Sequence, residues 1–134
     1  MNNPTPLLRP GYWCECWTKS PATGETPVLV ASIDVATAAD AIRWIRIALR
    51  TITPALDRAA SHDAWTWLTT GQLDATQLLQ AGKPCTYTAH HATTTIEWTA
   101  RPVTFLALVH GAASRPACAD GFRPPPVDLG PSDG

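Results

Sequence analysis

Three cysteines and one histidine are the residues whose types could bind a metal ion. Cys14 and Cys16 are two positions apart in an expected strand, so their side chains share one face. Cys85 and His91 share a face of a later expected strand, provided that the strand reaches His91. Such a set suits tetrahedral zinc. The spacing departs from the usual zinc pattern, and free cysteine is commonly buried, so apolar thiols are the favoured interpretation and no cofactor is predicted.

The residues available for nucleophilic catalysis form only two combinations. These are Cys85 with His90 or His91, and His62 with Asp63. A cysteine–histidine pair needs spatial adjacency and an orienting third group. The sequence contains none of the patterns G-x-S-x-G, G-x-x-x-x-G-K and H-E-x-x-H. We therefore expect a protein without catalysis of its own.

A long helix is expected from Thr37 to about Ile52, and it is apolar around most of its circumference. Thr37 is the expected N-cap, and Pro54 ends the helix. One face gathers Ala38, Ala41, Ile42, Ile45, Leu49 and Ile52. Trp44 and Ile47 point away from that face. They need a second cover, which is either a later helix or another chain.

The remaining sector of this helix carries Arg43, Arg46 and Arg50. A solvated helix face is the favoured interpretation, and an anionic partner is the alternative. Three helices followed by a hairpin are also the order of a winged helix-turn-helix, with Gly71 at its turn. However, the expected recognition helix, Asp74 to Ala81, contains no arginine. Nucleic-acid binding is therefore an alternative hypothesis and is not favoured.

The chain contains six tryptophans, of which Trp13 and Trp17 share one face of the first strand. If the face with Cys14 and Cys16 is core, these tryptophans point outward, where tryptophan is typical of interfaces. If the tryptophans are core, which is the commoner fate of this residue type, the cysteines become accessible. Together with the two-sided helix, this surplus favours an assembly partner. The candidate interface consists of Trp13, Trp17, Trp44 and Ile47.

The pattern of the whole chain predicts a two-layer α+β fold. The expected strands are Tyr12 to Lys19, Val28 to Val35, Cys85 to about His90, Thr93 to Arg101 and Val103 to Val109. Between the two pairs lie the long helix, a short helix capped by Ser61 and ended by Gly71, and the helix Asp74 to Ala81. The order strand–strand–helices–strand–strand indicates a mostly antiparallel sheet of four to five strands with helices on one face.

Composition divides the chain into an irregular arm over residues 1–10, a single domain over 11–111 and a disordered Pro/Gly-rich tail over 112–134. The net charge of −1 gives no global attraction to nucleic acid or membranes. No apolar run has the length of a membrane span or of a signal peptide. We expect a cytoplasmic location and reduced thiols.

The leading hypothesis is a small, non-catalytic protein-interaction module that associates with itself or with another protein. A winged-helix-like nucleic-acid-binding protein is the first alternative. A zinc- or thiol-dependent site at the cysteines is the second.

Overall fold

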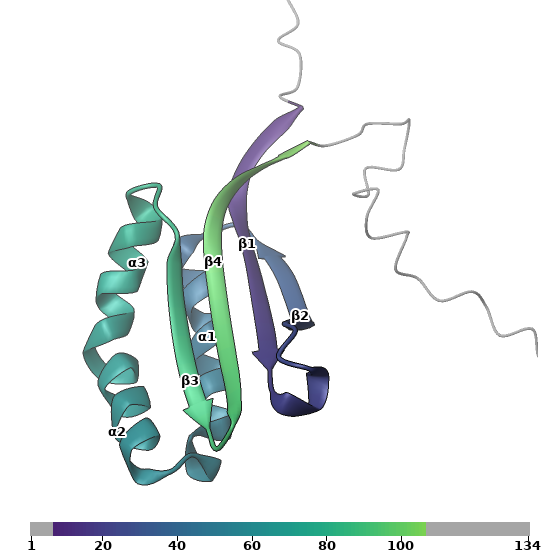
Figure 1. The fold of residues 1–134 in the computed structure, drawn as a ribbon. Helices are drawn as coiled ribbons and strands as arrows, with labels where there is room; N and C mark the ends of the chain where they lie inside the picture. Colours follow the sequence, from purple (N-terminus) through teal and green to yellow (C-terminus); the bar gives the residue numbers. More distant parts are fainter. Residues whose placement is uncertain (1–6, 107–134) are drawn as a thin grey trace, which may run out of the picture. The chain divides into compact units, whose positions relative to one another are not determined.

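The computed structural model describes residues 7–106, and residues 10–104 form one compact unit within it. The strands are β1 (Leu8–Lys19), β2 (Val28–Val35), β3 (Cys85–His91) and β4 (Thr94–Leu106). They form one sheet in the order β2-β1-β4-β3, in which neighbouring strands run in opposite directions (Figure 1). Of the described residues, 7–9 and 105–106 belong to a second unit. Within it, the Arg9 guanidinium lies 6.0 Å from the centre of the Phe105 ring.

β1 and β2 correspond to the first two predicted strands and pair as an antiparallel hairpin, with a short 3-10 turn (Pro21–Thr23) between them. Cys14 pairs with Ile33, and Cys16 pairs with Ala31. The register then shifts before Trp17, so that Val30 is the extra residue of a β-bulge.

Helix α1 (Ala38–Ile52) confirms the prediction for the long helix. The Thr37 hydroxyl accepts a hydrogen bond of 3.1 Å from the backbone N–H of Asp40, which satisfies one of the free donors of the first turn. The buried positions are Ala38, Ala41, Ile42, Ile45 and Leu49, as the periodicity indicated. A 3-10 turn (Thr53–Ala55) with Pro54 in its middle follows directly.

The two later helices differ from the prediction at their boundaries. Helix α2 (Arg58–Thr66) begins at Asp57, whose carboxylate accepts from the backbone N–H of Ala60 at 2.8 Å, so Ser61 is not the cap. Gly71 does not end a helix either, because a π-helical turn (Trp67–Gly71) continues into α3 (Gln72–Gln80). A Cβ atom at Gly71 would lie 2.7 Å from the Trp67 ring. Because glycine has no Cβ atom, the Trp67 indole can lie against the backbone of Gly71, one turn further along the helix.

β4 is longer than the predicted strand and includes the start of the expected fifth strand. Pro102 does not interrupt it, because β3 begins at Cys85, opposite Ala100, and leaves the strand beyond that point without a partner on that side. Residues 107–109 of the expected fifth strand and the whole expected tail lie outside the described residues. β1 begins at Leu8, so the end of the expected irregular arm belongs to a strand.

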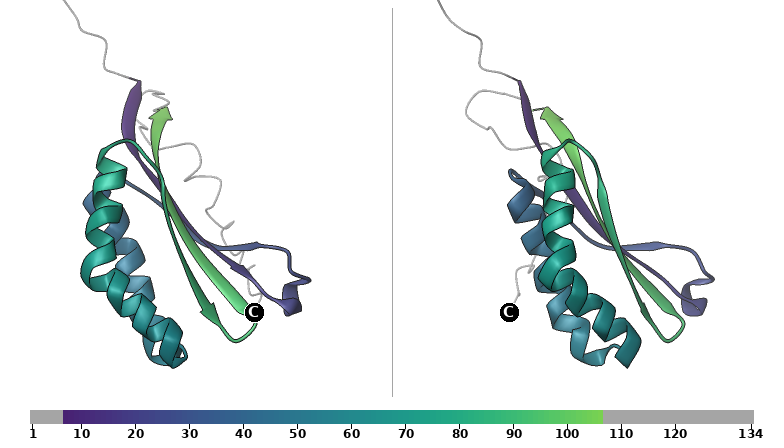
Figure 2. Two further views of the ribbon diagram at one scale, coloured as in Figure 1. Left: turned by 60° about the vertical axis from the view of Figure 1, so that its left-hand side comes forward. Right: turned by 90° about the vertical axis from the view of Figure 1, so that its left-hand side faces the viewer.

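The helices pack on one face of the sheet, which confirms the two-layer α+β fold with four strands (Figure 2). The core between the layers takes most of its sheet side chains from β1, β3 and β4: Cys14, Cys16, Cys85, Tyr87, Ala89, Trp98 and Ala100. Ala64, Leu68, Ala75 and Leu79 complete it from the helix pair α2–α3. No helix within residues 7–106 is long and apolar enough to cross a membrane.

Candidate interaction surface

The four candidate zinc ligands do not form a complete set, because the histidine lies apart from the cysteines. Cys14, Cys16 and Cys85 are buried on the helix-covered face, whereas His91 is exposed at the far end of β3. Cys85 and His91 are six positions apart, which is about 20 Å along an extended strand. Among the residues that the structure describes, no group of three His, Cys, Asp or Glu side chains is placed to hold a metal ion.

The cysteine thiols are also poorly suited to nucleophilic chemistry. Burial raises the pKa of Cys14 to about 12, with further contributions from the neighbouring Cys85 and Asp34. Burial likewise raises the pKa values of Cys16 and Cys85, the latter against an opposing hydrogen bond with the Ala100 backbone. Because the thiolate is the reactive form, these thiols are inert near neutral pH.

The second combination considered for catalysis has a structural role in the fold. The Tyr87 hydroxyl donates a hydrogen bond of 2.8 Å to the Asp63 carboxylate, which joins β3 to α2. The Tyr87 ring lies 5.2 Å from that of Trp67 and 6.3 Å from that of Trp98, measured between ring centres. Burial, followed by Asp63, raises the pKa of Tyr87. This aromatic cluster therefore fastens the α2–α3 helices to the β3 edge.

The arginine sector of α1 lies partly in solvent. Arg43 and Arg50 are exposed, whereas Arg46 is half-buried and its Nε atom has no hydrogen-bond partner among residues 7–106. The helix pair expected for a helix-turn-helix is not formed. Helix α2, the π-helical turn and α3 follow one another end to end (Figure 1), whereas that motif requires two helices crossing at about 90–120°.

Trp13 and Trp17 lie on the face of β1 opposite the buried cysteines, and both are half-buried. They therefore belong neither to the core between the layers nor to the fully exposed surface. The Trp17 indole donates to the Glu15 carboxylate at 3.2 Å, and the Arg101 guanidinium lies 3.6 Å from the same oxygen. Trp13 most strongly, then Trp17 and Arg101, lower the pKa of Glu15, and partial burial opposes them. The result is a polar surface with two indoles on the outer side of the sheet.

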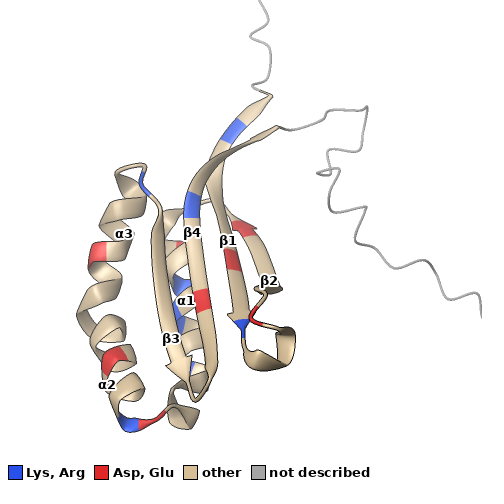
Figure 3. Ribbon diagram, viewed as in Figure 1, with Lys and Arg blue, Asp and Glu red and all other residues tan. Residues whose placement is uncertain are grey.

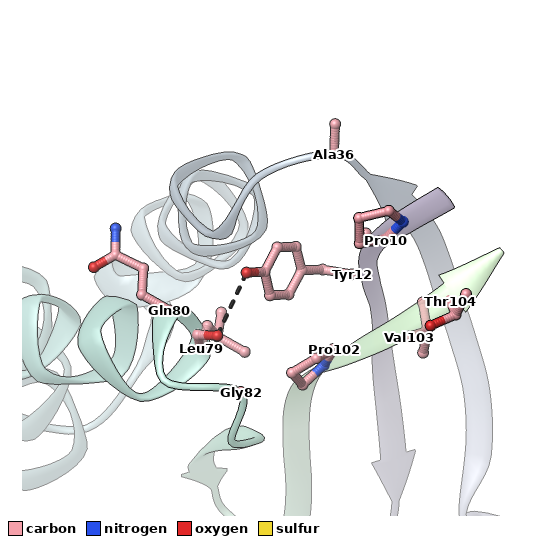
Figure 4. A pocket seen from close by; sticks show the side chains of 10 residues that line it. Pro10, Tyr12, Ala36, Leu79, Gln80, Gly82, Pro102, Val103 and Thr104 are labelled. Carbon is pink, nitrogen blue, oxygen red and sulfur yellow. Dashed lines mark hydrogen bonds between the residues drawn. The ribbon is translucent and has the colours of Figure 1, made fainter. Parts of the chain in front are cut away.

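An open hollow of about 420 Å³ lies between the end of α3 and the sheet (Figure 4). The Tyr12 hydroxyl donates a long hydrogen bond of 3.4 Å to the Leu79 carbonyl across it. Its other lining groups are Pro10, Gly11, Ala36, Gln80, Gly82, Pro102, Val103 and Thr104. This lining has no charged side chain to orient a polar substrate, so the hollow indicates no particular chemistry.

The main uncovered apolar element of the described residues is β2. The exposed fractions are 44% for Val28, 44% for Leu29, 58% for Val30 and 36% for Ile33. No residue of β2 is buried, although Cys14 and Cys16, which are paired with it on β1, are part of the core. The helical layer therefore covers the sheet as far as β1 and reaches β2 only at Val35, which is half-buried against the core, so the rest of β2 is open.

Of the residues expected at an interface on α1, Ile47 is 56% exposed and Trp44 is half-buried against the core. Sequence reasoning missed the exposure of β2 and the contribution of Val30. The available signal was the uninterrupted apolar run from Val28 to Ala31, because such runs are typical of strands that are covered on both faces. The described residues leave this run exposed, so the pattern of the sequence and the exposure in the structure do not match.

The exposed apolar strand β2 is thus the most distinctive surface of the described residues. The chain has to be interpreted from its own geometry, because no protein-family model, no curated protein and no solved structure matches it.

Proposed function

We propose that this chain is a non-catalytic assembly module that works by associating with itself. The observation that carries the proposal is β2, a strand with apolar side chains on both faces and no buried residue. Soluble monomers rarely expose contiguous apolar patches unless those patches bind something. On α1, Ile47 is a further exposed apolar side chain.

The charge distribution supports an apolar partner. Asp34 is the only charged residue of β2, and most of the β2 ribbon is accordingly tan in Figure 3. A partner selected by charge would require a dense group of charges on this strand, and none is there. The buried free cysteines fit a location in the cytoplasm, where thiols are kept reduced.

Native mass spectrometry of the full chain under reducing conditions, over a series of concentrations, tests this proposal. We expect a mass of two or more chains, and a bare monomer fraction that rises on dilution. A single chain at the highest soluble concentration would overturn the proposal. Added mass matching zinc would instead revive the cysteine site.

A further inference from the structure

The unpaired side of β2 is a second property of this strand, separate from its apolar side chains. β2 is the first strand in the order β2-β1-β4-β3 and pairs with β1 on one side. Alternate backbone N–H and C=O groups on its other side have no strand partner within residues 7–106. Such a row of groups is a template for pairing with another strand.

Natural edge strands are commonly protected by lysine, proline, a β-bulge or an inward-pointing charge. β2, with the sequence VLVASIDV, contains neither lysine nor proline. Its protective features are limited to the bulge at Val30 and the single acid Asp34. The stretch from Ala31 to Ile33, between these two features, carries no such protection.

We infer that β2 pairs antiparallel with β2 of a second copy of this chain, around a two-fold axis at Ala31 or Ser32. This inference rests on the proposed self-association and names the surface that carries it. The axis stands perpendicular to the sheet, so the two sheets join into one and the helices of both copies lie on the same face. Such an interface is isologous, because the same strand contributes from both sides.

The position of the axis follows from charge and side-chain size. With Ser32 on the axis, Ile33 faces Ala31 of the second copy on the inner side of the joined sheet. With Ala31 on the axis, Ile33 faces the position of Leu29 instead. In both registers the two Asp34 residues are at least about 13 Å apart along the strands. An axis at Ile33 would bring them to a diagonal position, where like charges repel.

The identity of the partner follows from the same features. An antiparallel strand pair with a two-fold axis is closed, so it accounts for a defined dimer without an open fibre. The strand offers no array of charges for recognition of a different protein. A second copy supplies an apolar strand of equal length, so the open backbone groups of both edges pair and the apolar side chains of the two strands pack beside one another.

Disulfide trapping tests the pairing, with all variants made in the Cys16→Ala, Cys118→Ser background. Cys16 is replaced because it lies opposite Ala31 on β1 and would compete for a cysteine there, and Cys118 is replaced because it lies outside the described residues. The variants are Ala31→Cys and Ser32→Cys on β2, and Thr86→Cys on the exposed face of β3 as the matched control. Only a residue on the axis brings its two copies within the Cα distance of about 4.4–6.8 Å that a disulfide needs. Oxidised glutathione serves as the oxidant, and non-reducing electrophoresis is the readout.

We expect one of the two β2 variants to give at least about tenfold more crosslinked dimer than Thr86→Cys, because pairing raises the effective thiol concentration to the millimolar range. A dimeric mass without crosslinking at either β2 position would overturn the strand pairing and leave self-association standing. A monomeric mass would overturn both. Equal crosslinking of the β2 and β3 variants would indicate random collision and would also overturn the pairing.

Discussion

The two edge strands of the sheet, β2 and β3, differ in what covers them. β3 alternates buried Cys85, Tyr87 and Ala89 with the exposed Thr86 and His90, so one face contacts helices and the other contacts water. β2 is apolar over most of its length and has no buried residue. Both strands lie at an edge, but only β3 has a face buried beneath helices.

The cause of this difference is the placement of the helical layer. Helices α2 and α3 both contact β3, and the Tyr87–Asp63 hydrogen bond ties α2 to it. The covered face of the sheet then ends at the cysteines of β1. Strand β3 is therefore stabilised by contacts within the chain, whereas most of β2 keeps its apolar surface exposed.

The largest effect is expected for truncation on the β3 side. Tyr87→Ala should lower the free energy of unfolding by about 3–5 kcal/mol, because it removes a ring that packs between two tryptophans. Val30→Ala, on β2, should change it by less than about 1 kcal/mol in dilute monomer, because Val30 is 58% exposed. Urea denaturation measures both. Equal losses would show that β2 is as well packed as β3.

The next effect concerns association. Val30→Lys should weaken self-association by about tenfold or more, because a lysine charge in a desolvated strand pair costs at least about 1.4 kcal/mol. Thr86→Lys, at an exposed position of β3, is the matched control and should leave the dissociation constant unchanged. Sedimentation equilibrium provides both constants, and circular dichroism verifies that both variants fold. Equal weakening by the two lysines would remove the distinction between the edges.

A smaller effect isolates the hydrogen bond that fastens β3. Tyr87→Phe keeps the ring and removes the hydroxyl that donates to Asp63, so the free energy of unfolding should fall by about 1 kcal/mol. Asp63→Ala in the Tyr87→Phe background should then have little additional effect. A large further loss in the double variant would mean that Asp63 has another role.

The smallest effect near neutral pH comes from the buried thiol of Cys14, which lies opposite Ile33 of β2. Burial raises its pKa from 9.0 to about 12, so above pH 9 the unfolded chain releases a proton that the folded chain retains. The free energy of unfolding should therefore fall as the pH rises from 9 towards 12. Cys14→Ala is the control and should make this slope shallower. An unchanged slope would assign the pH dependence to other groups.

The sequence predicted the features that depend on local contacts. The bounds of α1 followed from its periodicity and from the Thr37 cap, and β2 was placed from Val28 to Val35 as observed. The helix boundaries at Ser61 and Gly71 were wrong, because the Asp57 cap and the contact between Gly71 and the Trp67 ring override composition. Local propensity cannot show which indole needs that space.

The candidate site depended on strand order, which a single sequence does not show. Once β2 is at the edge and the helices cover β1, the Cys14 face becomes core and Trp17 turns outward. Ile47 was correctly expected to lie outside the buried face of α1. The sequence did not indicate Val30 as an interface residue. Its exposure depends on β2 being an edge strand, which follows from the pairing of β1 with β4, two strands that are far apart in the sequence.

Amide hydrogen exchange, measured as a function of protein concentration, tests whether β2 is the surface through which this chain associates with itself. If β2 is the surface of self-association, protection of residues 28–35 should rise with concentration, while protection of residues 85–91 stays constant. This experiment compares both edges in one unmodified chain. Protection of residues 28–35 that does not change between the monomeric and the assembled concentration range would contradict the account.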